Sequence, residues 1–349
     1  MFIPMKGIIM KRRTFLKAAG GLAGSLYLGT SNILQAAQAG STDGKISKRM
    51  LGRTGREISI IGFPGLALTR QGQEECTKLI HNAFEQGINY YDVAPSYGDG
   101  DAEIKMGVGL QGIDRDKIFI SCKTQRRDKD GAREELERSL KRLKTDHFDL
   151  YQLHSLARPE EVKQALGPGG AIETFLKAKE EGKVKNFGFS AHTTRAALDA
   201  LNGFKFDTCM FPVNFIEYFK IGLSKEVMSL AKEQGVAVIA IKGMAGGAWP
   251  DRNRRTRDHW YRTLEDNEEI AMALRFTLSQ EAVVTAIPPG FLDLLDKAIP
   301  AGQTYRKITD TETQKLQELA SPALSVFQRW QIAAGKRSYE RLQIGRAHV

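Results

Sequence analysis

The sequence predicts a (β/α)8 barrel, also called a TIM barrel, from the order and character of its apolar segments. From residue 58 onward, short apolar runs alternate with amphipathic stretches in about eight units over roughly 250 residues, the usual size of this barrel. Runs such as Val-Ala-Val-Ile-Ala-Ile (236–241) have no polar face, as expected of strands buried on both sides. Asp92, Lys123 and His154 each close such a run, and the strand ends of a parallel barrel share one face.

An open doubly wound sheet is the main alternative, and its sequence fingerprint is missing. That fold normally carries a Gly-rich turn between its first strand and first helix, whereas the first turn here reads Gly-Phe-Pro-Gly (62–65). A Gly-x-Gly-x-x-Gly match occurs at 107–112, but it ends a predicted helix and precedes a strand, the reverse of the order in dinucleotide-binding folds. We interpret it as a helix terminus.

In the first half of the barrel, apolar runs and amphipathic stretches predict strands at 58–62, 89–93, 117–123 and 148–154, and helices at 74–86, 102–110 and 132–143. The first helix should stop at Gly87, since glycine tolerates the left-handed conformation of a helix end. The third helix is amphipathic because Leu136, Leu140 and Leu143 share one face.

The second half continues the alternation, with strands expected at 184–190, 208–213, 236–242 and 283–287, and helices at 171–181, 194–201, 224–234 and 268–278. Gly182 closes the first of these helices, and Thr193 is placed to cap the second. We therefore expect the barrel to occupy 48–300. A C-terminal helical extension should fill 301–349, with helices at 311–320 and 323–332 separated by Pro322. The last residues, 344–349, resemble translated adapter sequence.

The N-terminal segment is predicted to be a twin-arginine signal peptide spanning 1–39. Lys-Arg-Arg-Thr-Phe-Leu-Lys (11–17) resembles the twin-arginine motif, a Gly/Ala-rich stretch follows, and Ala-Gln-Ala (37–39) suits signal peptidase. The apolar stretch is too short for a stable membrane span. We therefore expect a periplasmic or otherwise exported protein, with the twin-arginine export machinery as a partner.

The net charge of +10 does not indicate a nucleic-acid-binding surface. Residues 1–39 hold five basic and no acidic residues, which leaves 46 basic against 41 acidic residues for 40–349. That balance is only mildly basic. The cysteines Cys76, Cys122 and Cys209 are odd in number and far apart, so neither a disulfide framework nor a cysteine metal site is expected.

Four residues carry the expected chemistry: Asp92, Tyr97, Lys123 and His154. A tyrosine hydroxyl has a pKa near 10, but a lysine ammonium about 4 Å away favours the phenolate by roughly 4 kcal/mol at an effective dielectric of about 20. Tyr97 is thus expected to be a general acid with a lowered pKa, and Asp92 to orient Lys123. His154 would donate a hydrogen bond to a substrate oxygen. Such a set suits proton delivery to a carbonyl while hydride arrives from a nicotinamide, and it needs no metal.

With these residues in place, the chain resembles the aldo/keto reductases over about 48–300. The resemblance rests on Gly-Ile-Asn-Tyr-Tyr-Asp-Val-Ala-Pro-Ser-Tyr-Gly (87–98), on the segment from Arg138 to His154, and on Glu-Gly-Lys-Val-Lys-Asn-Phe-Gly-Phe-Ser (181–190). It implies a (β/α)8 barrel, catalytic roles for the four residues above, and NADP or NAD as cofactor. The cofactor contacts that it implies are Ser190, Lys242, Gly243, Pro288 and Gly290.

The cofactor side departs from the family pattern. The asparagine expected after Ser190 is Ala191, the expected glutamine falls on Met210, and the expected stacking aromatic falls on Ile241. Basic residues that would hold a 2′-phosphate are absent from 291–295. The choice between NADP and NAD therefore stays open.

Three functions remain under consideration. The first is a reductase or dehydrogenase acting on a small-molecule carbonyl or alcohol. The second is an exported enzyme that keeps its nicotinamide bound and cycles it between two sugar-like substrates, because free nicotinamides are scarce outside the cytoplasm. The third is a barrel that binds a ligand without turnover. The basic loop at 250–262 is either a solvated surface loop or a flap over an anionic ligand.

Overall fold

The computed structural model describes residues 44–251, 253, 255–321 and 324–334. Eight parallel strands form one sheet, and a parallel bridge between Ile61 and Ala286 joins its first and last strands into a barrel. The strands of the barrel, in order around it, are β3 (Phe63–Pro64), β4 (Tyr90–Asp92), β5 (Phe119–Thr124), β6 (Phe148–Leu156), β7 (Val184–Ala191), β8 (Thr208–Pro212), β9 (Ala237–Ile241) and β12 (Val283–Ile287). This confirms the predicted (β/α)8 class.

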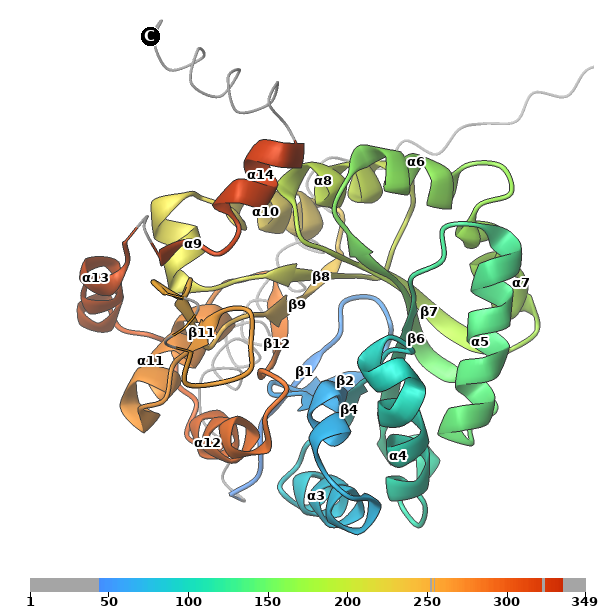
Figure 1. Cartoon of the computed structure of the whole chain (residues 1–349), viewed down its shortest axis with the longest axis horizontal. Coiled ribbons are helices and arrows are strands. Elements are labelled where there is room, and N and C mark those ends of the chain that lie inside the picture. Colours follow the sequence, from blue (N-terminus) through green and yellow to red (C-terminus); the bar gives the residue numbers. More distant parts are fainter. Residues whose placement is uncertain (1–43, 252, 254, 322–323, 335–349) are drawn as a thin grey trace, which may run out of the picture. The chain divides into compact units, whose positions relative to one another are not determined.

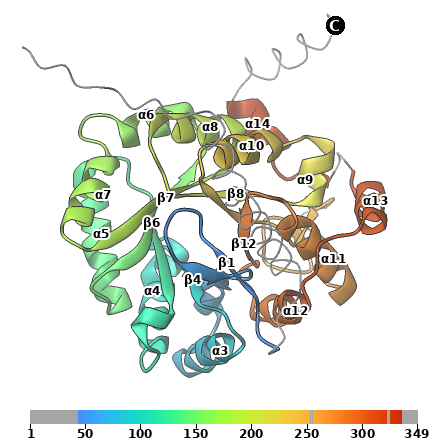
Figure 2. The same ribbon diagram turned by 180° about the vertical axis from the view of Figure 1, so that it is seen from behind.

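Helices surround the strands on the outside of the barrel (Figures 1 and 2). Those that alternate with the strands are α3 (Gln73–Glu85), α4 (Asp101–Gly109), α5 (Lys129–Leu143), α7 (Ala171–Glu180), α8 (Thr194–Gly203), α10 (Lys225–Glu233), α11 (Asn267–Leu278) and α12 (Leu292–Gln303). Gly87 adopts a φ of +99° after α3, and the Thr193 hydroxyl accepts from Ala196 N at the start of α8, both as predicted. The glycine motif at 107–112 lies at the end of α4 and before β5, which confirms its interpretation as a helix terminus.

The first predicted strand, 58–62, is divided between two elements, because Ile61 near its end bridges to Ala286 of β12 and takes part in closing the barrel. Its start belongs to β2 (Glu57–Ser59), which pairs antiparallel with β1 (Lys48–Met50), and the first barrel strand is β3, further along the chain. Leu51 and Ile58, carried by this hairpin and its turn, pack with Tyr90, Phe119 and other residues of the barrel interior. An apolar segment that is buried inside the barrel therefore resembles a barrel strand in its composition.

Several shorter elements lie in the connections. Three of the described helices were not predicted, namely α12, α6 (Pro159–Leu166) and α9 (Phe215–Lys220). The remaining pieces are the single turns η1 (Gly65–Arg70), η2 (Tyr97–Gly100) and η3 (Arg115–Lys117), and the hairpin β10 (Ala245–Gly247) with β11 (Arg262–Thr263). The hairpin brackets residues 248–261, which we call the β9 loop. This segment contains most of the basic loop noted in the sequence at 250–262.

The C-terminal extension contains α13 (Asp310–Leu319) and α14 (Gln328–Ala334), close to the two helices predicted there. Residues 324–334, which we call the C-terminal strap, cross the loops that follow β7, β8 and β9. Ala248 N donates to Leu324 O at 2.8 Å, and Val326 N donates to the Glu217 carboxylate at 2.6 Å. The Gln331 side chain bonds to Thr194 N at 2.9 Å and His192 O at 3.0 Å. The strap is thus fixed to three loops of one barrel face.

Within the part of the chain that the structure describes, no helix is both long and apolar enough to cross a bilayer. The predicted signal peptide, Pro322 and the residues resembling adapter sequence lie outside the described residues. The limits proposed for the signal peptide (1–39), the barrel (48–300) and the C-terminal extension (301–349) therefore stay predictions.

Candidate active site

A cavity of about 330 Å³ opens at the carboxyl ends of the barrel strands. Seven predicted site residues line it, namely Asp92, Tyr97, His154, Ser190, Lys242, Pro288 and Gly290. Lys123 lies just behind this wall with its side chain fully buried. Gly243 is not brought to the cavity, because a side chain at that position would point at Thr277 instead. The strand ends therefore gather eight of the nine predicted residues.

Lys123 connects the acidic and phenolic groups of the site. Its ammonium donates to Asp92 Oδ2 at 2.7 Å and to Val93 O at 3.0 Å, and its Nζ lies 3.4 Å from Tyr97 Oη. Burial alone would lower the pKa of Lys123, but attraction to Asp92 and Tyr97 raises it above its ordinary value. The lysine therefore remains a cation directly beside the tyrosine hydroxyl.

The pKa of Tyr97 does not follow the prediction. Burial raises the pKa of the Tyr97 hydroxyl above 10, and the opposing pull of Lys123 does not overcome it. The expectation of a lowered pKa treated the lysine charge alone and left out the cost of placing a phenolate away from water. Tyr97 is consequently a protonated donor at neutral pH, with the Lys123 ammonium placed where it would stabilise a phenolate.

His154 faces Tyr97 across the cavity, with ring centroids 5.8 Å apart. Burial lowers the pKa of His154 well below 6.5, and the nearby cations Lys123, Arg127 and Lys242 lower it further. The imidazole is therefore neutral, with one nitrogen as donor and the other as acceptor. Its Nδ1 lies 3.5 Å from Ser96 Oγ, which leaves the second nitrogen for a ligand in the cavity.

Lys242 brings a second ammonium to the cavity wall, at the end of β9 and with a φ of +66°. Burial lowers the pKa of Lys242 to about 8; attraction to Asp92 opposes this lowering, and repulsion from Lys123 adds to it. Its Nζ lies 5.4 Å from the centroid of the Trp260 ring and 5.3 Å from that of Tyr261. Among the described residues it has no carboxylate within 4.0 Å. An anionic ligand group would suit this position.

Ser190 is set up as a donor. Its Oγ accepts from Ser155 N at 2.7 Å, so its own proton is free for a ligand. Ser155 has a φ of +57°, which turns its N–H toward Ser190. The departures noted in the sequence also lie here, since Met210 and Ile241 both line the cavity.

Among its described residues, the β9 loop turns rings rather than guanidinium groups toward the cavity. His259, Trp260 and Tyr261 line the cavity. Arg257 is bound to the carboxylates of Glu265 and Asp293, and Arg262 donates to Gly246 O at 2.6 Å. These two arginines thus stabilise the loop itself. Trp260 also stacks on Trp330 of the C-terminal strap, at 6.0 Å between centroids and 19° between planes.

A model of the aldo/keto reductase family matches residues 61–321 of this chain, which is most of its length and includes every site residue above. The chain belongs to the aldo/keto reductase family.

The matches to individual aldo/keto reductases and related proteins are partial. The chain is 31% identical over 156 residues to the uncharacterized oxidoreductase YqkF of Bacillus subtilis, covering 41% of this chain and 48% of that protein. It is 25% identical over 226 residues to the probable aldo-keto reductase 1 of Glycine max, covering 59% and 62%. The matched segments therefore span from about half to less than two thirds of these relatives.

Solved aldo/keto reductase structures share the whole fold. The holo form of an aldo-keto reductase from Bacillus halodurans superposes with a TM-score of 0.64 at 23% identity, covering 82% of this chain and 100% of that one. An aldo-keto reductase from Klebsiella pneumoniae in complex with NADPH gives 0.61 at 19% identity, covering 79% and 96%. These likenesses establish the barrel architecture.

Three further polar residues near the strand ends have structural partners in this aldo/keto reductase. The Asn214 side chain caps α9 by accepting from Glu217 N, and Glu103 is paired with Arg142 at 3.0 Å. His192 lines the cavity but precedes the Thr193 cap and packs against Phe327 and Trp330. The signal that sequence reasoning missed is the triplet His-Trp-Tyr (259–261), which supplies the outer wall.

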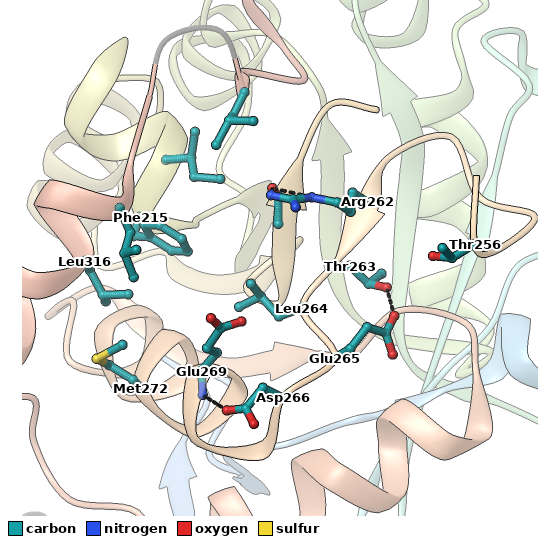
Figure 3. Close-up of a pocket in the computed structure, with 14 residues that line it drawn as sticks. Phe215, Thr256, Arg262, Thr263, Leu264, Glu265, Asp266, Glu269, Met272 and Leu316 are labelled. Atoms are coloured by element: carbon teal, nitrogen blue, oxygen red, sulfur yellow. Dashed lines mark hydrogen bonds between the residues drawn. The ribbon is translucent and has the colours of Figure 1, made fainter. Parts of the chain in front are cut away.

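A second cavity, of about 370 Å³, lies beside α9, α11 and α13 and contains none of the predicted site residues (Figure 3). Its floor is apolar, with Phe215, Leu264, Met272 and Leu316. Two of its acids are occupied by local structure, since Glu265 accepts from Thr263 Oγ1 and Asp266 caps α11. The predicted site residues are concentrated in the first cavity.

Proposed function

We propose that this aldo/keto reductase reduces an aldehyde or ketone to an alcohol, with hydride from a nicotinamide cofactor and a proton from Tyr97. The observation that carries the proposal is the contact between the Tyr97 hydroxyl and the buried Lys123 ammonium at 3.4 Å, with His154 opposite. Family membership supports the same chemistry. The reverse reaction, oxidation of an alcohol, would use the same groups.

The residues present fit a nicotinamide dinucleotide. The free hydroxyl proton of Ser190 suits a carboxamide, the Lys242 ammonium suits a phosphate, and α12 begins just after Pro288–Gly290 without a side-chain cap, so its N–H groups can meet an anion. A bound reduced nicotinamide would supply the hydride. Aldo-keto reductases from Klebsiella pneumoniae have been solved in complex with NADPH and with NADP, which supports NADP here, and NAD remains the alternative.

Each residue of the site has a defined part in this proposal. Tyr97 donates its proton to the carbonyl oxygen, and Lys123 stabilises the phenolate left behind. Asp92 keeps Lys123 charged and fixed in position. The neutral imidazole of His154 donates a hydrogen bond to the same oxygen and orients the carbonyl.

Substitution of Tyr97 tests the proposal. Wild-type protein should oxidise NADPH or NADH in the presence of an activated aromatic aldehyde, followed by absorbance, and Tyr97→Phe should lower kcat by about 10²- to 10⁴-fold. The Kd for the cofactor should stay within about twofold, because the hydroxyl acts on the substrate oxygen. Tyr305→Phe is the matched control, since its hydroxyl bonds to Leu278 O far from the cavity. Full activity in Tyr97→Phe would exclude Tyr97 as the acid.

An exported enzyme with retained cofactor is the second candidate. The predicted twin-arginine segment motivates export, and the β9 loop and C-terminal strap, joined at Trp260 and Trp330, motivate retention. Two partly matching relatives are named L-galactose dehydrogenase, from Arabidopsis thaliana, and 6-dehydroglucose reductase, from Novosphingobium aromaticivorans, which supports sugar-like substrates.

Protein recovered from the periplasm tests this second candidate. It should carry nicotinamide detectable by mass spectrometry after denaturation, and Arg12→Lys with Arg13→Lys should leave the protein in the cytoplasm. Cofactor-free protein from the periplasm would contradict retention. Tight binding without turnover of any carbonyl would instead support the ligand-binding barrel.

A further inference from the structure

Arg127 lies behind the active site, in the loop between β5 and α5. Its backbone carbonyl accepts from Ala171 N at 2.9 Å, and the next residue, Asp128, bridges to Gly170 at the start of α7. This loop is therefore fixed to a neighbouring helix. Arg127 is partly buried and is not among the residues that line the cavity, so it does not meet a ligand there.

The guanidinium of Arg127 holds the end of β6. Its Nη2 donates to His154 O at 2.7 Å. The other side of the same peptide unit is also held, because Ser155 N donates to Ser190 Oγ at 2.7 Å. The two contacts together restrain the backbone at the His154 Cα, and this limits the directions in which the imidazole can enter the cavity.

A structural role does not account for the charge of Arg127. Among the described residues its guanidinium forms no ion pair within 4.0 Å, and its Nε and Nη1 are buried without a hydrogen-bond partner. The nearest acids, Glu135 and Glu161, already accept from Gln125 N and from Ala157 N. An unpaired, partly desolvated cation destabilises a fold, and one bond to a carbonyl could be made by a smaller neutral donor.

We propose that Arg127 is a positioning residue of the active site, which fixes the His154–Ser155 peptide and keeps a positive charge behind the imidazole. The proposal rests on the role of His154 in the proposed function. Arg127 acts through His154 and does not touch the substrate.

The charge has a direct effect on His154. The cations and titratable groups that face the imidazole are Lys123 from β5, His192 after β7, Lys242 from β9, Tyr97 from η2 and Arg127. Lys123 is paired with Asp92, whereas Arg127 forms no ion pair within 4.0 Å among the described residues and feels Glu161 and Glu135 only without direct contact. Removal of the Arg127 charge should raise the pKa of His154. A protonated imidazole donates from both nitrogens and can no longer accept a hydrogen bond.

Arg127→Met in the full-length enzyme tests the proposal, with Arg127→Lys as the charge-conserving variant. With NADPH and an activated aromatic aldehyde, Arg127→Met should lower kcat by about 10- to 100-fold, with the cofactor Kd within about twofold. The low-pH limb of kcat/KM should move to higher pH. Arg127→Lys should restore that limb but only part of kcat, because an ammonium keeps the charge without the planar geometry.

Arg126→Met is the matched control, since Arg126 is an exposed neighbour paired with Glu135 at 3.5 Å. It should keep the wild-type kcat and pH profile. If Arg127→Met keeps the wild-type kcat and the wild-type pH profile and shows only a lower Tm, the proposal is overturned. If Arg127→Met fails to fold, an unchanged kcat in Arg127→Lys would do the same.

A readout without turnover separates this proposal from the proposed function. The His154 ring titration, followed by NMR in wild type and Arg127→Lys or Arg127→Met, does not depend on any substrate. Inactive wild-type protein would count against the reductase function alone. An identical His154 titration and ring environment in wild type and Arg127→Met would count against Arg127.

Discussion

Lys242 carries an ammonium group to the cavity wall at a cost to stability. The unfolded chain has an ordinary lysine pKa of 10.5, whereas burial lowers the pKa of Lys242 to about 8 in the folded protein. Since that group is only partly buried, the difference corresponds to about 1–3 kcal/mol of lost stability at neutral pH. A cost of that size is typical of a residue kept for binding.

Lys242→Met should therefore stabilise the protein while weakening cofactor binding. At pH 7 the free energy of unfolding should rise by about 1–3 kcal/mol, and the Kd for NADPH should rise about tenfold or more. Denaturant unfolding and calorimetric titration measure the two effects. A variant that is less stable than wild type and binds cofactor normally would contradict both assignments.

The pH dependence of the same group has a definite sign. Between pH 8 and 10.5 the unfolded chain holds a proton on this lysine that the folded protein has released, so stability from Lys242 should rise with pH across that window. Wild-type stability minus that of Lys242→Met should therefore increase from pH 7 to pH 10. A difference that stays constant with pH would show that the ammonium is not desolvated.

Strand-end position predicted which polar residues meet at the cavity. Asp92, Lys123 and His154 end buried runs, and the barrel brings such ends together whatever the loops do. The direction of the Tyr97 pKa was not predictable, because it depends on how deeply the finished cavity buries the hydroxyl. Gly243 does not line the cavity, because its direction is set by the left-handed turn at Lys242, and its cofactor contact stays a prediction.

At the scale of elements, the C-terminal strap is held by a few identifiable contacts. Gln331 bonds to Thr194 N and His192 O, the Glu217 carboxylate accepts from Ser325 and Val326, and Phe327 is fully buried. These bonds tie the strap to the starts of α8 and α9. The strap therefore depends on the loops of the active face and supports them in return.

Gln331→Ala should loosen the strap without unfolding the barrel. Loss of two partly buried hydrogen bonds costs about 1–2 kcal/mol, which raises the open population of the strap by about 5- to 30-fold. Hydrogen exchange of residues 324–334 should report the change, while α5 and β5 keep their protection. Gln328→Ala is the control, because that side chain is exposed. Equal exchange in both variants would argue against an anchoring role for Gln331.

Periodicity predicted long elements better than short ones. Most long helices were recovered within a few residues because repeated apolar positions define them, whereas the missed helices α6 and α9 span only eight and six residues. The longer helix α12 was also missed, and it contains Pro300. The error at the first strand has another cause. The hairpin β1–β2 buries Ile58 inside the barrel, and burial on all sides gives the same apolar signal as a strand.

For the whole molecule, the positions of the cysteines make a global prediction possible. Cys76 in α3, Cys122 in β5 and Cys209 in β8 are free and fully buried, and burial raises the pKa of each thiol. The thiols of the native protein should therefore not react with an aromatic disulfide reagent. All three thiols should react only as the barrel unfolds, at a rate that follows the loss of circular dichroism. Labelling of one thiol in fully folded protein would reveal a local opening.

The barrel as a whole was predictable because its signals repeat around the chain. The alternation of strand and helix, the fully apolar strands and the polar strand ends all indicate one architecture. The β9 loop and the strap were not predictable in the same way, since their packing depends on contacts between segments about 70 residues apart, such as Trp260 with Trp330. Such pairings leave no periodic pattern in the sequence.

The stacking of Trp260 on Trp330 makes tryptophan fluorescence a reporter of the cavity. The chain contains three tryptophans. Trp260 and Trp330 stack on each other beside the cavity, and the indole of Trp249 donates to His259 O within the same loop, at 2.8 Å. Indole emission overlaps the absorption of a reduced nicotinamide, so every fluorophore of this type lies where a bound cofactor would quench it by energy transfer. Intrinsic fluorescence can thus follow occupancy of the site without any label.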